Sequence, residues 1–412
     1  MFGKLNRPAS ASDPNLASSR TFRLLASCLM LLLLPQLPAF AQTPHVHHLW
    51  YNNSNWQDQD LTALTGAPEP YGVSQIAAFY TTPNHQFHVF YSDVNSHIHQ
   101  LYYNNTSWSD TDLTALTGGA DAGAGGSGFA IGNSQYVFYV GLYDTHVHEL
   151  SYIDNWTDQD ITAQVAGAPL AGFGSFVAFA TKPNNQFHVY YPDRTYSPGH
   201  LHQLYFNGTS WSDADLTAIT GAICEGSEWS TGFATGNLQH ILCPGYHGTN
   251  PGYFDLLHIY YNNDTWVYED ITEEAGGAQL PIYASTGQAG FAVGREGEVY
   301  GIPVDTDVYQ YTYKNGKWDS LDLTAYIGAP QNIYCDAMVG FPTTPNNQFH
   351  IYYAPSSLLN QSYADVYQLY FNGTTWAVND LTAGVSQAYL CTGMAGFAIG
   401  NLQHVFYFGI EN

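Results

Sequence analysis

Four histidine pairs recur in the chain, each with one residue between the two imidazoles. Residues two apart in a strand lie on the same face, so each pair could offer two nitrogen ligands to a zinc ion. A zinc site needs a third protein ligand, and we find none at a fixed spacing from the pairs. We therefore predict no metal site, and expect the imidazoles to make hydrogen bonds or contact a ligand. The pairs are His45 and His47, His97 and His99, His146 and His148, and His200 and His202.

Carboxylates offer two other kinds of chemistry. A group of aspartates could bind calcium, but too few oxygen ligands accompany them, so we expect a solvated turn there. Glutamates that break the symmetry of the chain could include the acid pair of a glycosidase, but no spacing selects a pair. Sialidase chemistry needs an arginine cluster, and beyond residue 41 only Arg194 and Arg295 remain. We predict no catalytic residue, no cofactor and no enzyme. The aspartates are Asp58, Asp110, Asp158 and Asp213, and the glutamates are Glu225, Glu228, Glu269, Glu273 and Glu274.

A tryptophan motif repeats seven times and shows which elements must position these residues. Each tryptophan is followed four residues later by Asp, then by Leu or Ile, then by Thr, and successive copies are 48 to 58 residues apart. Such a period is typical of repeat architectures. We expect the tryptophan to pack between units, and the aspartate to hold backbone N–H groups in a turn. The seven tryptophans are Trp56, Trp108, Trp156, Trp211, Trp266, Trp318 and Trp376.

Each repeat reads as four short antiparallel strands. An alternating aromatic run such as HIHQLYY precedes each tryptophan, Asn-Asn or Asn-Gly supplies a hairpin turn, and two further strand candidates lie upstream. No segment reads as helical. Radial repetition protects strand edges, so we predict an all-β, seven-bladed β-propeller over residues 42–412, with its last blade closed by both chain ends. The predicted blades are 74–117, 124–166, 174–221, 230–276, 288–328, 338–385, and 394–412 joined with 43–66.

The stretch HVFYSDVNSHIHQLYYNNTSW, residues 88–108, resembles the repeat of the fucose-specific lectin propellers, a family of secreted sugar-binding proteins. In that family an Arg and a Glu bind sugar hydroxyls, and aromatic rings stack on the sugar between blades. The resemblance implies carbohydrate binding at His88, Gln100, Tyr103 and Trp108. No repeat keeps the Arg, and only Glu149 keeps the Glu. The other residues implied by the same register are Tyr152, His188, Gln203, Phe206, Trp211, His240, His258, Tyr261, His350, Gln368, Phe371, His404, His48 and Tyr51.

We therefore expect a non-catalytic, lectin-like protein whose partners are glycans or glycoconjugates. Several similar sites on one ring would raise avidity, whereas a catalyst needs a single site. Two alternatives stay open: a protein-interaction propeller and, with less support, an enzyme acting on glycosides.

Composition and the first residues bear on partners and location. Beyond residue 41 the chain has five basic side chains against 33 acidic ones, which disfavours nucleic acid and anionic membrane surfaces. Residues 1–41 contain Arg20, Arg23, the apolar run LLASCLMLLLLPQLP and the ending Ala39-Phe40-Ala41, typical of a signal peptide cleaved near Ala41. We expect a secreted protein, extracellular or periplasmic, without membrane insertion. Cys335 and Cys391 occupy matching repeat positions and form a candidate bridge, with Cys224 and Cys243 remaining.

Overall fold

The computed structural model shows an all-β chain with a few short helices. The residues that it describes are 43–71, 75–172, 176–194, 199–224, 230–245, 253–262, 264–276, 280–281, 288–293, 296–301, 307–331, 338–355, 363–383, 386–389 and 393–411. None of the described helices is long and apolar enough to cross a membrane.

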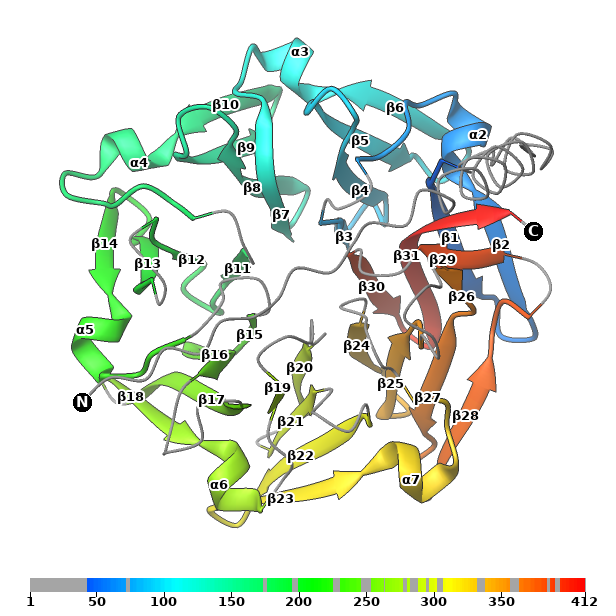
Figure 1. The fold of residues 1–412 in the computed structure, drawn as a ribbon. Coiled ribbons are helices and arrows are strands. Elements are labelled where there is room, and N and C mark those ends of the chain that lie inside the picture. The colour runs from blue at the N-terminus through cyan, green and yellow to red at the C-terminus, as the bar shows by residue number, and fades with distance from the viewer. Residues whose placement is uncertain are drawn as a thin grey trace, which may run out of the picture. The chain divides into compact units, whose positions relative to one another are not determined.

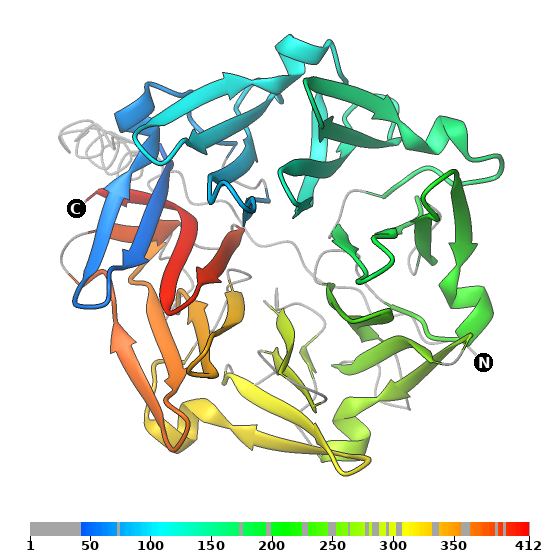
Figure 2. The ribbon, with the colours of Figure 1, turned by 180° about the vertical axis from the view of Figure 1, so that it is seen from behind.

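The described strands form seven antiparallel sheets that follow one another around a ring (Figure 1), which Figure 2 shows from behind. The strand of each sheet nearest the centre contacts its counterpart in the next sheet, and the series closes on itself. Five of the sheets have four strands each. These contacts run from β3 (Ala77–Tyr80) to β7 (Ala122–Ile131), β11 (Val177–Ala180), β15 (Thr231–Thr235), β20 (Gln288–Val293), β24 (Met338–Thr343), β30 (Met394–Ile399) and back to β3.

The remaining strands lie progressively farther from the centre. In the five four-stranded sheets they are β4 (Phe87–Ser92), β5 (Ile98–Tyr103) and β6 (Trp108–Asp112); β8 (Ser134–Gly141), β9 (Val147–Tyr152) and β10 (Trp156–Asp160); β12 (Phe187–Pro192), β13 (Leu201–Phe206) and β14 (Trp211–Asp215); β21 (Glu296–Gly301), β22 (Tyr309–Lys314) and β23 (Lys317–Asp322); and β25 (Gln348–Tyr353), β27 (Tyr367–Phe371) and β28 (Trp376–Asp380). The sheet of β15 adds β16 (Leu238–Gly245), β17 (Tyr253–Asn262), β18 (Thr265–Asp270) and the short β19 (Leu280–Pro281).

The closing sheet joins strands from both ends of the chain. It contains β1 (His45–Tyr51), β2 (Trp56–Asp60), β30, β31 (Leu402–Glu411), and two extra strands, β26 (Tyr363–Ala364) and β29 (Ser386–Tyr389). Strand β30 covers one edge of β31 as far as Tyr407, and β29 pairs with the same edge from Gly409 to Glu411. The predicted fold class, with four strands in every blade, is therefore wrong as stated. Extra strands appear where a long strand would otherwise leave an edge unpaired.

Short helices follow the outer strands, contrary to our expectation that no segment is helical. They lie on the outside of the ring (Figure 1). The cause is the repeated Asp: Asp112 is the N-cap of its helix, and its Oδ1 accepts a hydrogen bond from the Ala115 backbone N–H at 2.8 Å. The helix ends at Gly118, whose φ of 68° suits glycine. The helices are α2 (Leu61–Thr65), α3 (Leu113–Thr117), α4 (Ile161–Gln164), α5 (Leu216–Thr220), α6 (Ile271–Ala275) and α7 (Leu323–Ile327).

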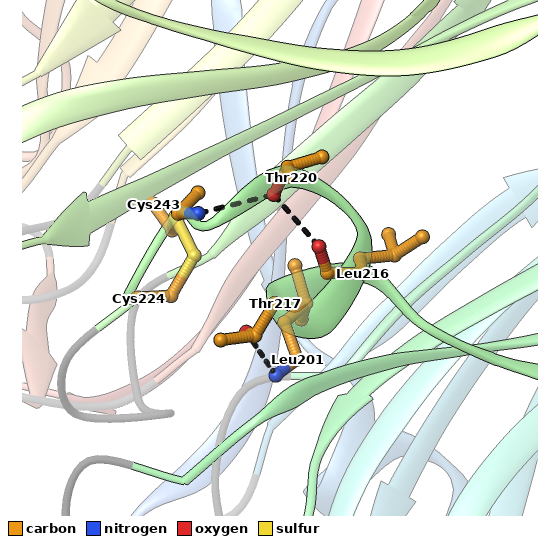
Figure 3. Close-up of a disulfide and its surroundings, with 7 residues drawn as sticks. Leu201, Leu216, Thr217, Thr220, Cys224 and Cys243 are labelled. Atoms are coloured by element: carbon orange, nitrogen blue, oxygen red, sulfur yellow. Dashed lines mark hydrogen bonds between the residues drawn. A yellow bond between two sulfur atoms is a disulfide. The ribbon is translucent and has the colours of Figure 1, made fainter.

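The Leu and Thr of the motif attach each helix to its sheet. Leu113 is fully buried, and the Thr114 hydroxyl accepts a hydrogen bond from the Ile98 backbone N–H at 2.9 Å. The same bond joins Leu201 and Thr217 (Figure 3). The hydrogen bond from the Ala115 N–H to Asp112 confirms the interpretation of the Asp as an acceptor of turn N–H groups.

The core lies between adjacent sheets. Phe138 and Val140 on β8, for example, share a buried cluster with Val189 and Leu204 of the next sheet. The motif tryptophans pack edge to face on buried aromatic rings of the preceding sheet, as Trp156 does on Phe90 with ring centroids 5.9 Å apart. The packing role expected for the tryptophan is confirmed. Equivalent contacts are made by Trp56 on Tyr352, Trp108 on Phe406, Trp211 on Phe138 and Trp266 on Tyr190.

A disulfide joins Cys224 to Cys243, close to the end of α5 (Figure 3). Cys243 is fully buried on β16, so the bridge ties the segment after α5 to the neighbouring sheet. The other candidate bridge, Cys335 to Cys391, lies outside the described residues, as does the predicted signal peptide.

Candidate functional site

Most of the histidine, acid and amide side chains predicted to contact a sugar are buried in the protein interior. His88 is 1% exposed and Gln100 is 5% exposed. His240 is half-buried. The others of this group are all buried: His48, Glu149, His188, Gln203, His258, His350, Gln368 and His404.

These buried groups satisfy one another. The Gln100 side-chain amide donates one hydrogen bond to His88 Nδ1 at 2.9 Å and another to Gln135 Oε1 on the next sheet at 2.8 Å. Since Nδ1 accepts, the ring proton sits on Nε2, which faces the Thr81 hydroxyl at 3.2 Å. The network recurs with His188, Gln203 and Gln239, and again with His350, Gln368 and Gln403.

Burial also sets the charge of these rings. It lowers the pKa of His88 and of His188 to about 3, and that of His350 to about 4. Two sheets have a histidine pair in these positions instead, His48 with His404 and His240 with His258, each at 3.0 Å on adjacent strands. The rings of His88, His188 and His350 are thus neutral at physiological pH, and the networks to which they belong join adjacent sheets.

Glu149 occupies the position of Gln100 in its own sheet and is 6% exposed. Burial raises its pKa to about 7, a hydrogen bond with Ser151 opposes the rise, and the charge of Asp158 adds to it. The one carboxylate that the resemblance would place against a sugar is therefore also an interior group.

The predicted aromatic residues lie at the surface instead. Tyr103 and Trp108 are half-buried at the base of a hairpin, with ring centroids 5.3 Å apart. The same half-buried position holds for Tyr51, Tyr152, Phe206, Trp211, Tyr261 and Phe371.

Sequence reasoning missed the residue just before each of these aromatics. Tyr205 points to the opposite face of its strand from Phe206 and stacks on the buried His188, with ring centroids 5.2 Å apart. Tyr261 of the next sheet lies close enough to raise the pKa of Tyr205, which burial raises first. The signal was present as aromatic doublets, YF in this repeat and YY in two others.

Tyrosines of adjacent sheets lie near one another at two further interfaces. Burial and then Tyr152 raise the pKa of Tyr102, and burial, Glu269 and then Tyr313 raise that of Tyr260. At the Tyr205–Tyr261 interface, the Gln186 side chain hydrogen-bonds the Tyr205 side chain and lies half-buried beside the pair. Flat aromatic faces with a planar amide next to them can hold a small polar ligand that has one apolar face.

The four aspartates for which we expected a solvated turn instead hydrogen-bond histidines of the four pairs. His99 Nδ1 lies 3.1 Å from the Asp110 carboxylate, and His97 Nδ1 lies 2.8 Å from Asp112 Oδ2. The prediction that the imidazoles make hydrogen bonds is confirmed, and the solvated turn is wrong because the cross-strand register of β5 and β6 brings the two motifs together. The matching pairs are His47 with Asp58, His148 with Asp158, and His202 with Asp213.

Comparisons with known proteins identify the fold. No family model and no curated protein matches the chain. Among solved structures, the BP39L lectin of Burkholderia pseudomallei is similar with a TM-score of 0.53, 14% identity, and coverage of 79% of this chain and 89% of that one. The fucose-specific lectin of Aleuria aurantia has a TM-score of 0.50 and 13% identity, covering 76% of this chain and 97% of that one. This chain shares its fold with fucose-specific lectins.

The comparison also bears on the predicted number of blades. The Aleuria aurantia lectin is described as a six-bladed β-propeller, with 13% identity and a TM-score of 0.49. The seven blades predicted from the sequence thus disagree with the six blades described for that lectin. The likeness lies in an all-β propeller built from similar sheets, of which the described residues of this chain form seven.

Proposed function

We propose that this protein is a non-catalytic carbohydrate-binding protein, and that its sugars stack on the aromatic pairs between adjacent sheets. The observation that carries this proposal is the repeated proximity of tyrosines from adjacent sheets, with Tyr205, Tyr261 and the adjoining Gln186 as its main example. Carbohydrate rings have apolar C–H faces that pack on aromatic rings, and amphipathic Tyr offers a hydroxyl as well. The lectin fold of the structural neighbours supports the same class of ligand.

The specificity of the site follows from its polar groups. Gln186 beside Tyr205 offers both a donor and an acceptor to sugar hydroxyls, without a charge. The five basic side chains beyond residue 41 are too few to favour acidic sugars. We therefore propose neutral sugars as ligands, bound through stacking and neutral hydrogen bonds.

Repetition of the pairs would serve avidity. At three interfaces a tyrosine of the next sheet helps to raise the pKa of Tyr102, Tyr205 or Tyr260. A fourth, where Ser151 is buried at the position of Tyr102, has no such pair and should not bind. A glycan that presents several copies of one sugar would engage more than one interface at once.

A glycan array with the purified protein, followed by isothermal titration with the best neutral ligand, tests the proposal. Tyr261→Ala should remove one binding equivalent, whereas Tyr326→Ala, which removes a tyrosine 63% exposed on α7, should change nothing. No binding to any glycan on the array would overturn the proposal. Capture of a protein partner without glycan would favour an interaction propeller, and sugar release from glycosides would favour an enzyme.

We also propose that the protein is secreted after cleavage near Ala41. The Cys224–Cys243 disulfide supports this, because disulfides persist in oxidising compartments. N-terminal sequencing of protein recovered from the culture medium should begin close to Gln42, and an intact Met1 on protein retained in the cell would contradict secretion.

A further inference from the structure

The turn before β9 brings two histidines and three aspartates together. His148 Nε2 lies 3.0 Å from Asp144 Oδ2, and its Nδ1 lies 3.1 Å from Asp158 Oδ1. His146 Nδ1 lies 2.6 Å from Oδ2 of Asp160, the N-cap residue of α4. His148 is buried, while Asp144 is 38% exposed, so the cluster opens to solvent on one side.

The donor atoms are spaced as ligands of one ion. Asp144, His148 and Asp160 each offer an atom, and these atoms lie within 4.8 Å of one another. Ligands of a tetrahedral zinc ion lie about 2 Å from the metal, and hence roughly 3.3 Å apart. Small side-chain rotations at the exposed Asp144 would close the remaining difference.

The hydrogen bond at His148 Nδ1 favours a metal ion at Nε2. The Asp158 carboxylate accepts the proton of His148 Nδ1, which leaves the lone pair of Nε2 directed at Asp144. A histidine oriented by a carboxylate in this way is the usual arrangement around a protein-bound metal. Two acceptors 3.0 Å apart repel unless a proton or a cation lies between them.

A related cluster with a different ligand set occurs in the next sheet. His200, His202 and Asp215 offer three ligand atoms within the same mutual distance, and Asp213 holds His202 Nδ1 at 3.0 Å. His202 Nε2 lies 4.0 Å from Asp215 Oδ2. The third ligand that sequence reasoning did not find is thus the N-cap aspartate, which follows the second histidine by 12 residues in one sheet and 13 in the other.

We propose that these two clusters are binding sites for a divalent transition-metal ion of the zinc class. Imidazole and carboxylate ligands in this number suit zinc, with water or the neighbouring histidine completing the coordination. Bound metal would fix the turn before the third strand of each sheet to the start of the helix that follows the fourth. The metal clusters share no residue with the aromatic pairs, and the proposal does not depend on carbohydrate binding.

The closing sheet provides a natural comparison. His47 Nδ1 is held by Asp58 at 3.1 Å, as in the other two sheets, but its buried Nε2 has no hydrogen-bond partner. Gly409 pairs with His45 there, at the position where Asp193 pairs with His200. Asp60 pairs with His47 there, as Asp215 pairs with His202, so this sheet keeps the N-cap aspartate but has no counterpart of Asp193.

Isothermal titration of ZnCl₂ into EDTA-treated protein tests the proposal, with Co²⁺ absorption as a second readout of tetrahedral N/O coordination. Wild type should bind two equivalents, one for each cluster. Asp144→Asn and His200→Gln, both at partly exposed side chains, should each leave one equivalent. The double variant should bind neither, with affinity at least about tenfold weaker. Asp154→Asn, in an exposed hairpin of the same sheet as His148, should keep two.

Two outcomes would overturn the proposal. One is the absence of saturable Zn²⁺ or Co²⁺ binding by folded wild type, in which case His148 is held by a proton. The other is unchanged binding in the double variant, which would place the metal elsewhere. Circular dichroism of each variant separates loss of the sites from loss of the fold.

Discussion

The side-chain amide of Gln100 donates a hydrogen bond to the side-chain carbonyl of Gln135 across the gap between two sheets, over 2.8 Å. Gln203 with Gln239 and Gln368 with Gln403 repeat the contact at 2.6 and 2.7 Å. The resemblance to the lectin repeat implied a sugar contact at Gln100. In this structure the same side chain joins neighbouring sheets.

Replacing Gln100 should therefore affect stability rather than binding. In Gln100→Ala, His88 Nδ1 and Gln135 Oε1 lose their donor while they stay buried, which should lower the free energy of unfolding by about 2 to 3 kcal/mol. Urea unfolding followed by tryptophan fluorescence measures the change. Normal stability together with weaker glycan binding would instead assign Gln100 to the sugar site.

The helix caps should stabilise each sheet independently. Asp112→Ala removes the acceptor for the Ala115 N–H and should cost about 1 kcal/mol of unfolding free energy. Asp160→Ala should cost a similar amount, and the double variant the sum, because the two caps share no partner. A double variant no less stable than either single one would show that the caps do not act as described.

The repeat made the strand order predictable, since alternation and Asn-rich turns mark strands whatever they pack against. The helix after each Asp was missed because four or five residues are too few to show a helical period. The prediction of the sugar-binding residues was limited for a different reason. Residues 100 and 102 share one face of a strand, and the sequence shows this, but only the packed structure shows that Gln100 is interior and Tyr102 is at the surface. Carrying residues over from a related motif cannot reveal that a polar residue now bonds the next sheet.

Acid should destabilise the fold. The unfolded chain takes up protons at histidine near pH 6.5, but burial lowers the folded pKa of His88, His188 and His240 to about 3 and of His350 and His404 to about 4. The stability that these neutral rings contribute is therefore present above pH 6.5 and lost as the pH falls, by up to about 2 kcal/mol for each ring at pH 5.

Other histidines oppose this trend. Burial lowers the pKa of His148, but its bonds to Asp158 and Asp144 outweigh burial and raise it, so its contribution is greatest below pH 6.5 and is lost as the pH rises. His202 behaves alike. The histidines with a lowered pKa outnumber those with a raised pKa, and their pKa values shift further. We therefore expect a lower Tm at pH 5 than at pH 7.5 in scanning calorimetry. A higher Tm at pH 5 would contradict this balance, and His188→Gln should flatten the profile.

The disulfide should contribute measurably to stability. Cys224 and Cys243 are 19 residues apart, and closing a loop of that length restricts the unfolded chain by about 3 kcal/mol. The Cys224→Ala, Cys243→Ala double variant should lose about that much in urea unfolding. Wild type with reductant should approach the variant, and equal midpoints for all three samples would contradict the effect.

Calorimetric titration of one neutral glycan ligand into wild type and Tyr205→Ala tests the account most directly. Tyr205 stacks on His188 from outside the buried network, so its removal should leave the fold intact and abolish one sugar-binding equivalent. The account predicts more than one equivalent for wild type and one fewer for the variant. Equal stoichiometry and affinity for the two proteins would contradict sugar binding at the aromatic pairs.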